Sequence, residues 1–186
     1  MEKSISVLII MLFFLAGFKS EQESKYVLIR TVAKQIPNFK KTVNVAEVNQ
    51  DDVEKLDEPL RALAAYYSSL AGSNCDGKTC DLTKALNLGM QGSSEHKELI
   101  SKWFPNDSVA KQVVRQNCFQ ASSGSSYFRN YNYLEFIVKA DTVIINYEVT
   151  VYNHGKTSVI KDPDKVLLRN NEIIVIMQNI WKKSKI

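Results

Sequence analysis

The feature that most constrains the fold is a change in hydrophobic period near the middle of the chain. Between about residues 57 and 118, apolar residues recur every three to four positions, which is the period of an α-helix. From about residue 131 onward, apolar and polar residues alternate, as in a β-strand that has one face in water. Because the helices come first, the sequence predicts an α+β fold in which N-terminal helices pack on one face of an antiparallel sheet.

Four helices are expected in the first half. The first covers 57–71, with Asp57 as its N-cap, Pro59 in its first turn and Gly72 at its end. Its apolar face is predicted to consist of Leu60, Leu63, Ala64, Tyr67, Leu70 and Ala71. The three later helices are expected to begin at Asp81, at Ser93 or Ser94, and at Asn106 or Asp107.

The second half predicts a meander of four to five strands. Alternation is clearest over 142–151, and the turns Ala140-Asp141, Asn153-His154-Gly155 and Asn170-Asn171 separate successive strands. Asp162-Pro163-Asp164 is predicted to be a further turn. The last strand, 173–176, is apolar on both faces, so we expect it to be central in the sheet or covered on both sides.

The chain divides into three parts by composition and pattern. Residues 1–17 are expected to be removed, residues 18–51 form a lead-in segment, and residues 52–186 form a single domain. Within the lead-in, residues 26–29 are compatible with a strand or a short helix, and residues 43–48 suggest an extended piece. The hydrophobic share of 45% and the charged share of 24% are those of a soluble globular protein.

Residues 1–17 are predicted to be a cleaved signal peptide. The apolar run from Ile5 to Phe18 would span about 21 Å as a helix, which is shorter than a hydrocarbon core of about 30 Å. Cleavage is expected after Gly17, with Ser20 as the alternative site. Phe18 stands where a bacterial lipoprotein would carry its lipidated cysteine. We therefore expect a periplasmic or secreted protein without a stable membrane anchor; an uncleaved leader acting as a weak anchor is the alternative.

The chain contains three cysteines, and an exported protein meets an oxidising environment. Four residues separate Cys75 from Cys80, a spacing that allows the two Cα atoms to approach within about 6 Å. The sequence therefore predicts a Cys75–Cys80 disulfide that pins a turn. Cys118 is then an odd thiol, expected to be buried at the end of a helix. The spacing lacks the second pair of ligands that a zinc site needs, so no metal is expected.

Three segments carry a resemblance to a known fold. Residues 141–155 look like a long central hairpin, residues 166–181 like a closing pair of strands, and the helix at 57–71 like an opening helix. In these respects the chain resembles the nuclear transport factor two-like (cystatin-like cone) superfamily. The resemblance implies a curved sheet around the helices and a pocket at the mouth of the cone. The lead-in segment and the four helical pieces before the sheet depart from the family pattern, and members differ widely in function.

No glycine-rich phosphate loop, nucleophile elbow or metal-binding helix is present. His96 is expected to be buried and hydrogen-bonded or to lie at the core boundary, and His154 to be exposed in a turn. An acid–base pair in a cone pocket could use Asp141, Glu135, Glu148 or a tyrosine. Glu135 and Glu148 occupy the strand face opposite the apolar residues, so we expect them to lie in water. We therefore predict no catalytic residues and no cofactor.

Aromatic residues are the remaining candidates for a binding site. Tyrosine and tryptophan combine a ring that packs with a group that hydrogen-bonds, and the predicted ligand contacts are Tyr67, Trp103, Tyr147 and Trp181. The net charge of +4 is not arranged as a basic stripe, which argues against nucleic acid as a partner.

The function expected from these observations is that of an exported, non-catalytic domain that binds a small apolar ligand or a partner protein. The alternatives are a small cone-fold enzyme of isomerase or lyase type, and a protein inhibitor or immunity-type factor. Self-association as a homodimer through the sheet is a further alternative. A cavity with an ionisable residue of shifted pKa would favour an enzyme, whereas a filled core with an apolar patch outside would favour a protein partner.

Overall fold

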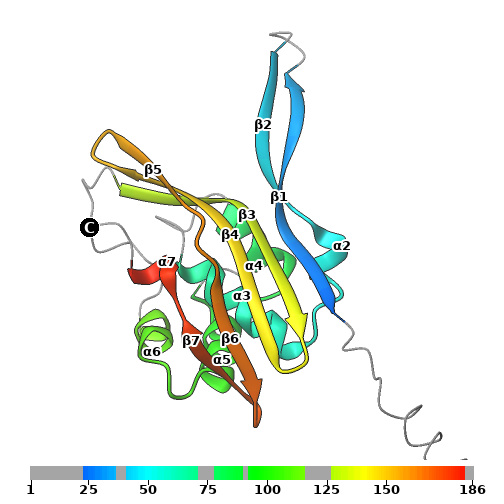
Figure 1. Ribbon diagram of the computed structural model, residues 1–186, viewed down its shortest axis with the longest axis vertical. Coiled ribbons are helices and arrows are strands. Elements are labelled where there is room, and N and C mark those ends of the chain that lie inside the picture. The colour runs from blue at the N-terminus through cyan, green and yellow to red at the C-terminus, as the bar shows by residue number, and fades with distance from the viewer. Residues whose placement is uncertain (1–22, 37–40, 71–77, 90–91, 116–126, 183–186) are drawn as a thin grey trace, which may run out of the picture.

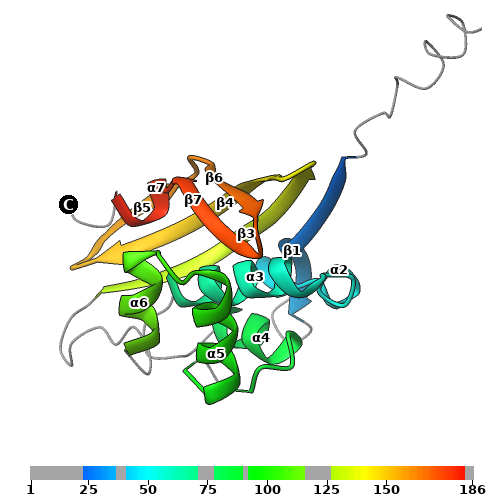
Figure 2. The same ribbon diagram turned by 90° about the horizontal axis from the view of Figure 1, so that it is seen from below.

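The computed structural model describes residues 23–36, 41–70, 78–89, 92–115 and 127–182. They form a curved antiparallel sheet of seven strands with a layer of helices on one face, which confirms the predicted α+β class (Figures 1 and 2). We call the face covered by helices the inner face and the opposite face the outer face. The sheet has more strands than the four to five predicted, because the lead-in segment supplies two of them.

The strands follow one another in the order β2-β1-β3-β4-β6-β7, and β5 pairs with β4 beside β6. Their bounds are β1 (Ser24–Ile36), β2 (Lys41–Val48), β3 (Tyr127–Lys139), β4 (Thr142–Asn153), β5 (Lys156–Ile160), β6 (Asp164–Arg169) and β7 (Glu172–Met177). The first half of β4 pairs with β6 and its second half with β5, so both short strands lie along the same edge of β4.

Alternation along β4 produces the two faces as predicted. Its inward residues are buried and its outward residues are half-buried; the inward ones are Val143, Ile145, Tyr147, Val149 and Val151. The hairpin between β6 and β7 closes through Asn170 and Asn171, whose φ angles of 52° and 58° fit a type I′ turn. The turn predicted at Asn153-His154-Gly155 forms over His154 and Gly155, with φ angles of 46° and 83°, while Asn153 ends β4; His154 is exposed.

Helices α3, α4, α5 and α6 form the layer below the sheet in Figure 2. The helices of the described residues are α2 (Gln50–Val53), α3 (Glu58–Leu70), α4 (Lys78–Ala85), α5 (Ser94–Trp103), α6 (Ser108–Arg115) and α7 (Asn179–Lys182). None of them is long and apolar enough to cross a bilayer.

Local signals set three of the four predicted helix starts. The side chain of Asp57 accepts a hydrogen bond from the N–H of Leu60 (3.1 Å), and that of Asp107 from the N–H of Ala110 (2.6 Å). Ser93 is the N-cap of α5. The predicted start at Asp81 is wrong: α4 begins three residues earlier, so Asp81 lies within its first turn, where a carboxylate also suits the helix dipole.

The segment that the sequence left open forms the hairpin of β1 and β2. β1 pairs with β3 over its first half and with β2 over its second half, and the paired ends of β1 and β2 extend away from the body (Figure 1). The hydroxyl of Thr31 donates to the backbone oxygen of Asn132 (3.0 Å), a contact between residues 101 positions apart. This partner is too distant in sequence for local patterns to reveal.

The expectation that the last strand is central or covered on both sides is wrong. β7 lies at the edge of the sheet, and among the described residues only β6 pairs with it. The inner face of β7 contacts α3 and α5, so burial explains the apolar residues on that face. It does not explain the other apolar residues, because Ile174 is 39% exposed and Ile176 is 53% exposed.

Several predictions fall outside the described residues. These are the signal peptide at 1–17, Cys75, the side chain of Cys80, and Cys118. The disulfide and the fate of the odd thiol therefore stay predictions.

Candidate functional site

A fully buried carboxylate, Asp164, is the most unusual group in the described core. The hydroxyl of Tyr67 donates to its Oδ2 atom (2.7 Å) and the hydroxyl of Tyr147 donates to its Oδ1 atom (3.1 Å). The backbone N–H of Asn179 also donates to Oδ1 (2.5 Å). These contacts join α3, β4, β6 and the start of α7 at one point.

Burial raises the pKa of the Asp164 carboxyl, and hydrogen bonding by these three donors and by the N–H of Ile180 only partly offsets that rise. Burial, reinforced by this carboxylate, raises the pKa of the Tyr67 hydroxyl well above its usual value, so Tyr67 remains a proton donor. A carboxylate with a raised pKa beside a hydroxyl can serve as an acid–base pair in an accessible site. Here both side chains are fully buried and bonded to each other, so the arrangement acts as a structural joint.

The structure brings two of the four predicted ligand-binding residues together. Tyr67 and Tyr147 meet at Asp164 within the core. Trp103 lies half-buried at the end of α5, where its indole N–H donates to Glu58 Oε1 (3.1 Å). The side chain of Trp181 lies outside the described residues. Ligand contact by these four residues stays a prediction.

The carboxylates considered for acid–base chemistry lie on or beside the outer face. Asp141 is exposed and pairs with Arg169 (3.2 Å), and Glu148 pairs with Lys161 (2.7 Å). The expectation that both glutamates lie in water is wrong for Glu135, which is buried although it faces outward. Lys25 covers it.

Three groups surround Glu135 on the outer face. Its carboxylate accepts from the amino group of Lys25 (2.5 Å), the hydroxyl of Tyr133 (2.6 Å) and the side-chain amide of Asn146 (2.8 Å). Burial alone would raise the pKa of Glu135, but these three donors together hold it below its usual value. The residue therefore stays ionised and joins β1, β3 and β4.

His96 is buried and hydrogen-bonded, one of the two environments expected for it. Its Nε2 atom lies 3.2 Å from the backbone oxygen of Ala65, and its Nδ1 atom accepts from the N–H of Gly92 (3.4 Å). Burial lowers the pKa of this imidazole. The contacts fit a neutral ring with its proton on Nε2, which links α5 to α3.

An apolar patch covers one end of the outer face. Strand registers place Ile137 beside Ile144, and Leu167 beside Ile174, on that face. Met177 faces outward next to Lys165 and is 40% exposed, and Ile176 is exposed where the β6–β7 register shifts. We call these six residues the outer apolar patch: Ile137, Ile144, Leu167, Ile174, Ile176 and Met177.

The other end of the outer face is polar. A shallow groove of about 540 Å³ lies there between β1 and the segment after β5. Its lining includes Arg30, Tyr133, Glu148 and Lys161. Glu148 is engaged by Lys161 and by Asn132 (3.1 Å). The outer face thus changes from paired charges near β1 to the outer apolar patch near β7, where Lys165 also points outward between Ile144 and Met177.

The open edge of β7 adjoins the outer apolar patch. An edge strand presents unpaired backbone N–H and C=O groups, which can pair with a strand from another chain. Natural edges are commonly protected by lysine, proline or inward charges. β7 has the sequence Glu-Ile-Ile-Val-Ile-Met, so its one charge stands at its first residue. This edge has both the backbone groups and the side chains that strand addition requires.

Sequence reasoning missed Asp164 and misplaced β7. Asp-Pro-Asp is typical of a turn, which hid the fact that Asp164 is in phase with the inward residues Val166 and Leu168. That phase is the signal that could have found it. For β7, apolar residues on both faces indicated that both faces would be buried. They did not indicate which elements would bury them.

Comparisons of the chain with models of protein families, with curated proteins and with solved structures found no match.

Proposed function

We propose that this protein is a non-catalytic binding domain that recognises an extended segment of another protein. The segment would pair with the open edge of β7 and lay alternate apolar side chains on the outer apolar patch. The observation that carries the proposal is the placement of a strand that is apolar on both faces at the edge of the sheet, with Ile174 and Ile176 39% and 53% exposed.

The chemistry of the edge defines the partner. Backbone hydrogen bonds would supply sequence-independent affinity, and alternate side chains would supply selectivity. Every second residue of the partner would face the patch, because side chains of a strand alternate between faces. The partner segment is therefore expected to be extended, about six residues long to match β7, and apolar at alternate positions.

Peptide selection tests this function. Twelve-residue random peptides displayed on phage would be selected on the full chain, and the recovered peptides measured by isothermal titration calorimetry. We expect alternating apolar residues and at least a tenfold loss of affinity in Ile176→Lys. An exposed edge lysine would place a charge in the apolar contact while changing stability by only about 0.5 kcal/mol.

Val159→Lys is the matched control. Val159 is also an exposed apolar residue of the outer face (49%), but it lies on β5 and away from the β7 edge. Peptide affinity should be unchanged in this variant, and hydrogen exchange should slow at β7 amides when peptide binds. Equal losses in both variants, or selected peptides that protect no β7 amide, would contradict the proposal.

A second copy of the chain is the alternative occupant of the same edge. Antiparallel pairing of two β7 strands would give a two-fold symmetric dimer. Sedimentation velocity over a range of concentrations separates the two cases. If the parent protein is a dimer and Ile176→Lys is a monomer, the β7 edge serves self-association and not peptide binding.

Export of the domain is part of this proposal and rests on the sequence of residues 1–17. N-terminal sequencing of the protein secreted by its native cells should begin at Phe18 or at Glu21. Recovery of the protein with Met1 at its N-terminus would remove the exported setting but not the β7 edge.

A further inference from the structure

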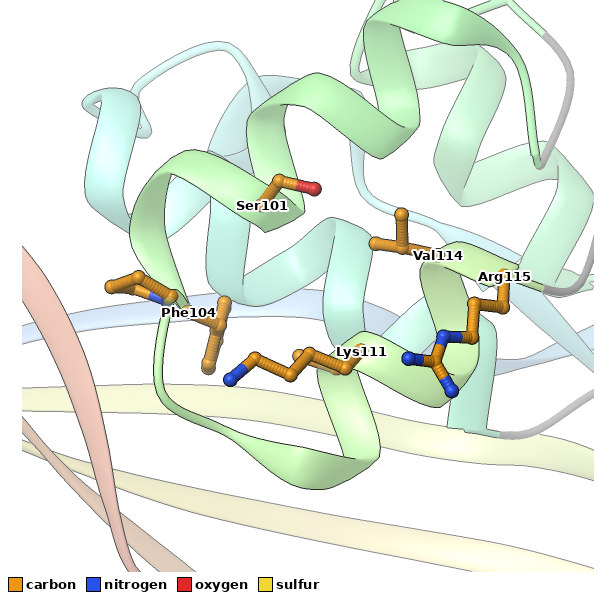
Figure 3. A pocket seen from close by; sticks show the side chains of 7 residues that line it. Ser101, Phe104, Lys111, Val114 and Arg115 are labelled. Carbon is orange, nitrogen blue, oxygen red and sulfur yellow. The ribbon is translucent and has the colours of Figure 1, made fainter.

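A cleft between α5 and α6 lies on the helical layer, on the opposite side of the sheet from the outer apolar patch. Its volume is about 270 Å³, and it is lined by Ser101, Phe104, Pro105, Ala110, Lys111, Val114 and Arg115 (Figure 3). It shares no residue with the outer apolar patch or with the Asp164 joint. Binding at this cleft is therefore independent of binding at the β7 edge.

The interior of the cleft is apolar and fixed in place. Phe104 is almost fully buried, and its ring stacks on Tyr66 at a centroid distance of 4.4 Å. Ala110 is likewise buried, and Val114 is half-buried one turn further along α6. Tyr66 is itself held by Gln178, whose side-chain amide donates to its hydroxyl (2.7 Å). The apolar wall is thus braced by the core.

Two cations stand at the rim. Lys111 and Arg115 are one helical turn apart on α6 and both are exposed. Figure 3 shows their side chains on the same side of α6, with the amino end of Lys111 directed toward Phe104. Neither forms an ion pair with a carboxylate of the described residues.

The acidic residue that directly precedes α6 is already hydrogen-bonded. Asp107, one turn before Lys111, accepts from the N–H of Ala110 (2.6 Å) and from the hydroxyl of Tyr66 (3.4 Å). On α5, Lys102 pairs with Glu58. Lys111 and Arg115 thus place two positive charges at this rim that pair with no described carboxylate, and they border an apolar interior.

We propose that this cleft binds a small amphipathic carboxylate. The apolar part would pack against Pro105 and Val114, above the buried Phe104 and Ala110, and the carboxylate would lie between Lys111 and Arg115. An arginine can hold a carboxylate through two parallel hydrogen bonds, and the lysine adds a mobile second cation. A cleft of about 270 Å³ admits only a small molecule. Octanoate and 3-phenylpropanoate, each with one carboxylate and one short apolar part, are suitable probes.

Titration of the full chain with octanoate and with 3-phenylpropanoate tests this site. Two-dimensional NMR of isotope-labelled protein should show saturable shifts at the amides of Ala110 and Val114. Octanol has the same chain length without the charge, and we expect it to bind at least tenfold more weakly than octanoate. Absence of saturable binding by both carboxylates, or equal binding of octanol, would overturn the proposal.

Two variants separate recognition of the carboxylate from recognition of the apolar part of the ligand. Lys111→Gln with Arg115→Gln should weaken octanoate at least tenfold and leave octanol unchanged. Val114→Trp should fill the cleft and weaken both molecules, with circular dichroism confirming the fold. Lys84→Gln, on exposed α4 surface, is the matched control and should bind as the parent does. Unchanged octanoate affinity in the double glutamine variant would overturn the assigned role of the two cations.

Discussion

The strands at the two ends of the sheet, β2 and β7, differ in the residues that they carry along their edges. At one end, β2 is an edge strand with the sequence Lys-Thr-Val-Asn-Val-Ala-Glu-Val, in which polar and charged residues recur along the strand. Glu47 of β2 also pairs with Lys34 of β1. At the other end, β7 carries five consecutive apolar residues after Glu172. Charges along an edge discourage pairing with other strands, whereas an apolar edge permits it. The comparison favours β7 over β2 as the edge at which the proposed partner strand would pair.

Each end is also held by an aspartate, and the two differ in environment. Asp52 of α2 accepts from the N–H of Val27 on β1 (2.9 Å) and pairs with the exposed Lys55 (2.9 Å). Asp164 at the β6 end has no exposed surface and is bound by two tyrosine hydroxyls and a backbone N–H. The β1 end is thus fixed by a solvated anchor, and the β7 end by a buried one.

The largest expected effect is the unequal cost of removing these anchors. Asp164→Ala leaves the hydroxyls of Tyr67 and Tyr147 and the N–H of Asn179 without their acceptor inside the core. We expect a loss of about 3 kcal/mol in the free energy of unfolding. Asp52→Ala exposes its former donor to water and should cost about 1 kcal/mol. Urea denaturation measures both, and equal losses would contradict the distinction between a buried and a solvated anchor.

A smaller effect is an opposite response of the two anchors to pH. Burial raises the folded-state pKa of Asp164 above the unfolded value of about 3.9, so its contribution is greatest at low pH and is lost as pH rises. Lys55 and the N–H of Val27 lower the folded-state pKa of Asp52. Its contribution is therefore present above about pH 4 and is lost as pH falls through the lowered pKa.

Asparagine variants measure this response. The stability difference between the parent protein and Asp164→Asn should move in favour of the parent as pH falls from about 6 to about 3. The difference between the parent and Asp52→Asn should shrink over the same range. Each tenfold change in an acid dissociation constant corresponds to about 1.4 kcal/mol, which sets the scale for the buried group. Changes of the same sign in both pairs would refute the assignment of the two environments.

The same contrast explains what the sequence could predict. Local signals sufficed for the alternation of β4, the Asn170-Asn171 turn and the caps at Asp57 and Ser93, because each depends on residues a few positions apart. The outer location of Glu135 followed from its phase in β3. Its burial did not, because it depends on Lys25, which lies 110 positions earlier in the chain and reaches Glu135 only through the pairing of β1 with β3.

The candidate binding surface was only half predictable. Apolar residues on both faces of 173–176 correctly indicated a strand that needs cover, and its inner face is covered by α3 and α5. The pattern could not show that β7 lies at the edge of the sheet with Ile174 and Ile176 exposed. A two-sided apolar strand is thus compatible with a central position or with an interface, and strand order decides between them. The cleft between α5 and α6 was also missed, because its lining comes from two helices whose packing the sequence did not specify.

The smallest expected effect comes from transferring the character of β7 to β2. Thr42→Ile with Asn44→Ile replaces two exposed polar residues and makes the edge of β2 largely apolar. If apolar composition at an open edge is what permits pairing, peptides selected on β7 should find a second, weaker site. Cross-strand side-chain pairs contribute about 0.2–1 kcal/mol each, so the new site should be several-fold weaker than β7.

Calorimetric stoichiometry should rise from one peptide to two, while Thr42→Gln with Asn44→Gln, which keeps the edge polar, should stay at one. A stoichiometry of one in the isoleucine variant would show that β7 binds through a feature that β2 lacks, and the outer apolar patch beside it would be the next feature to transfer.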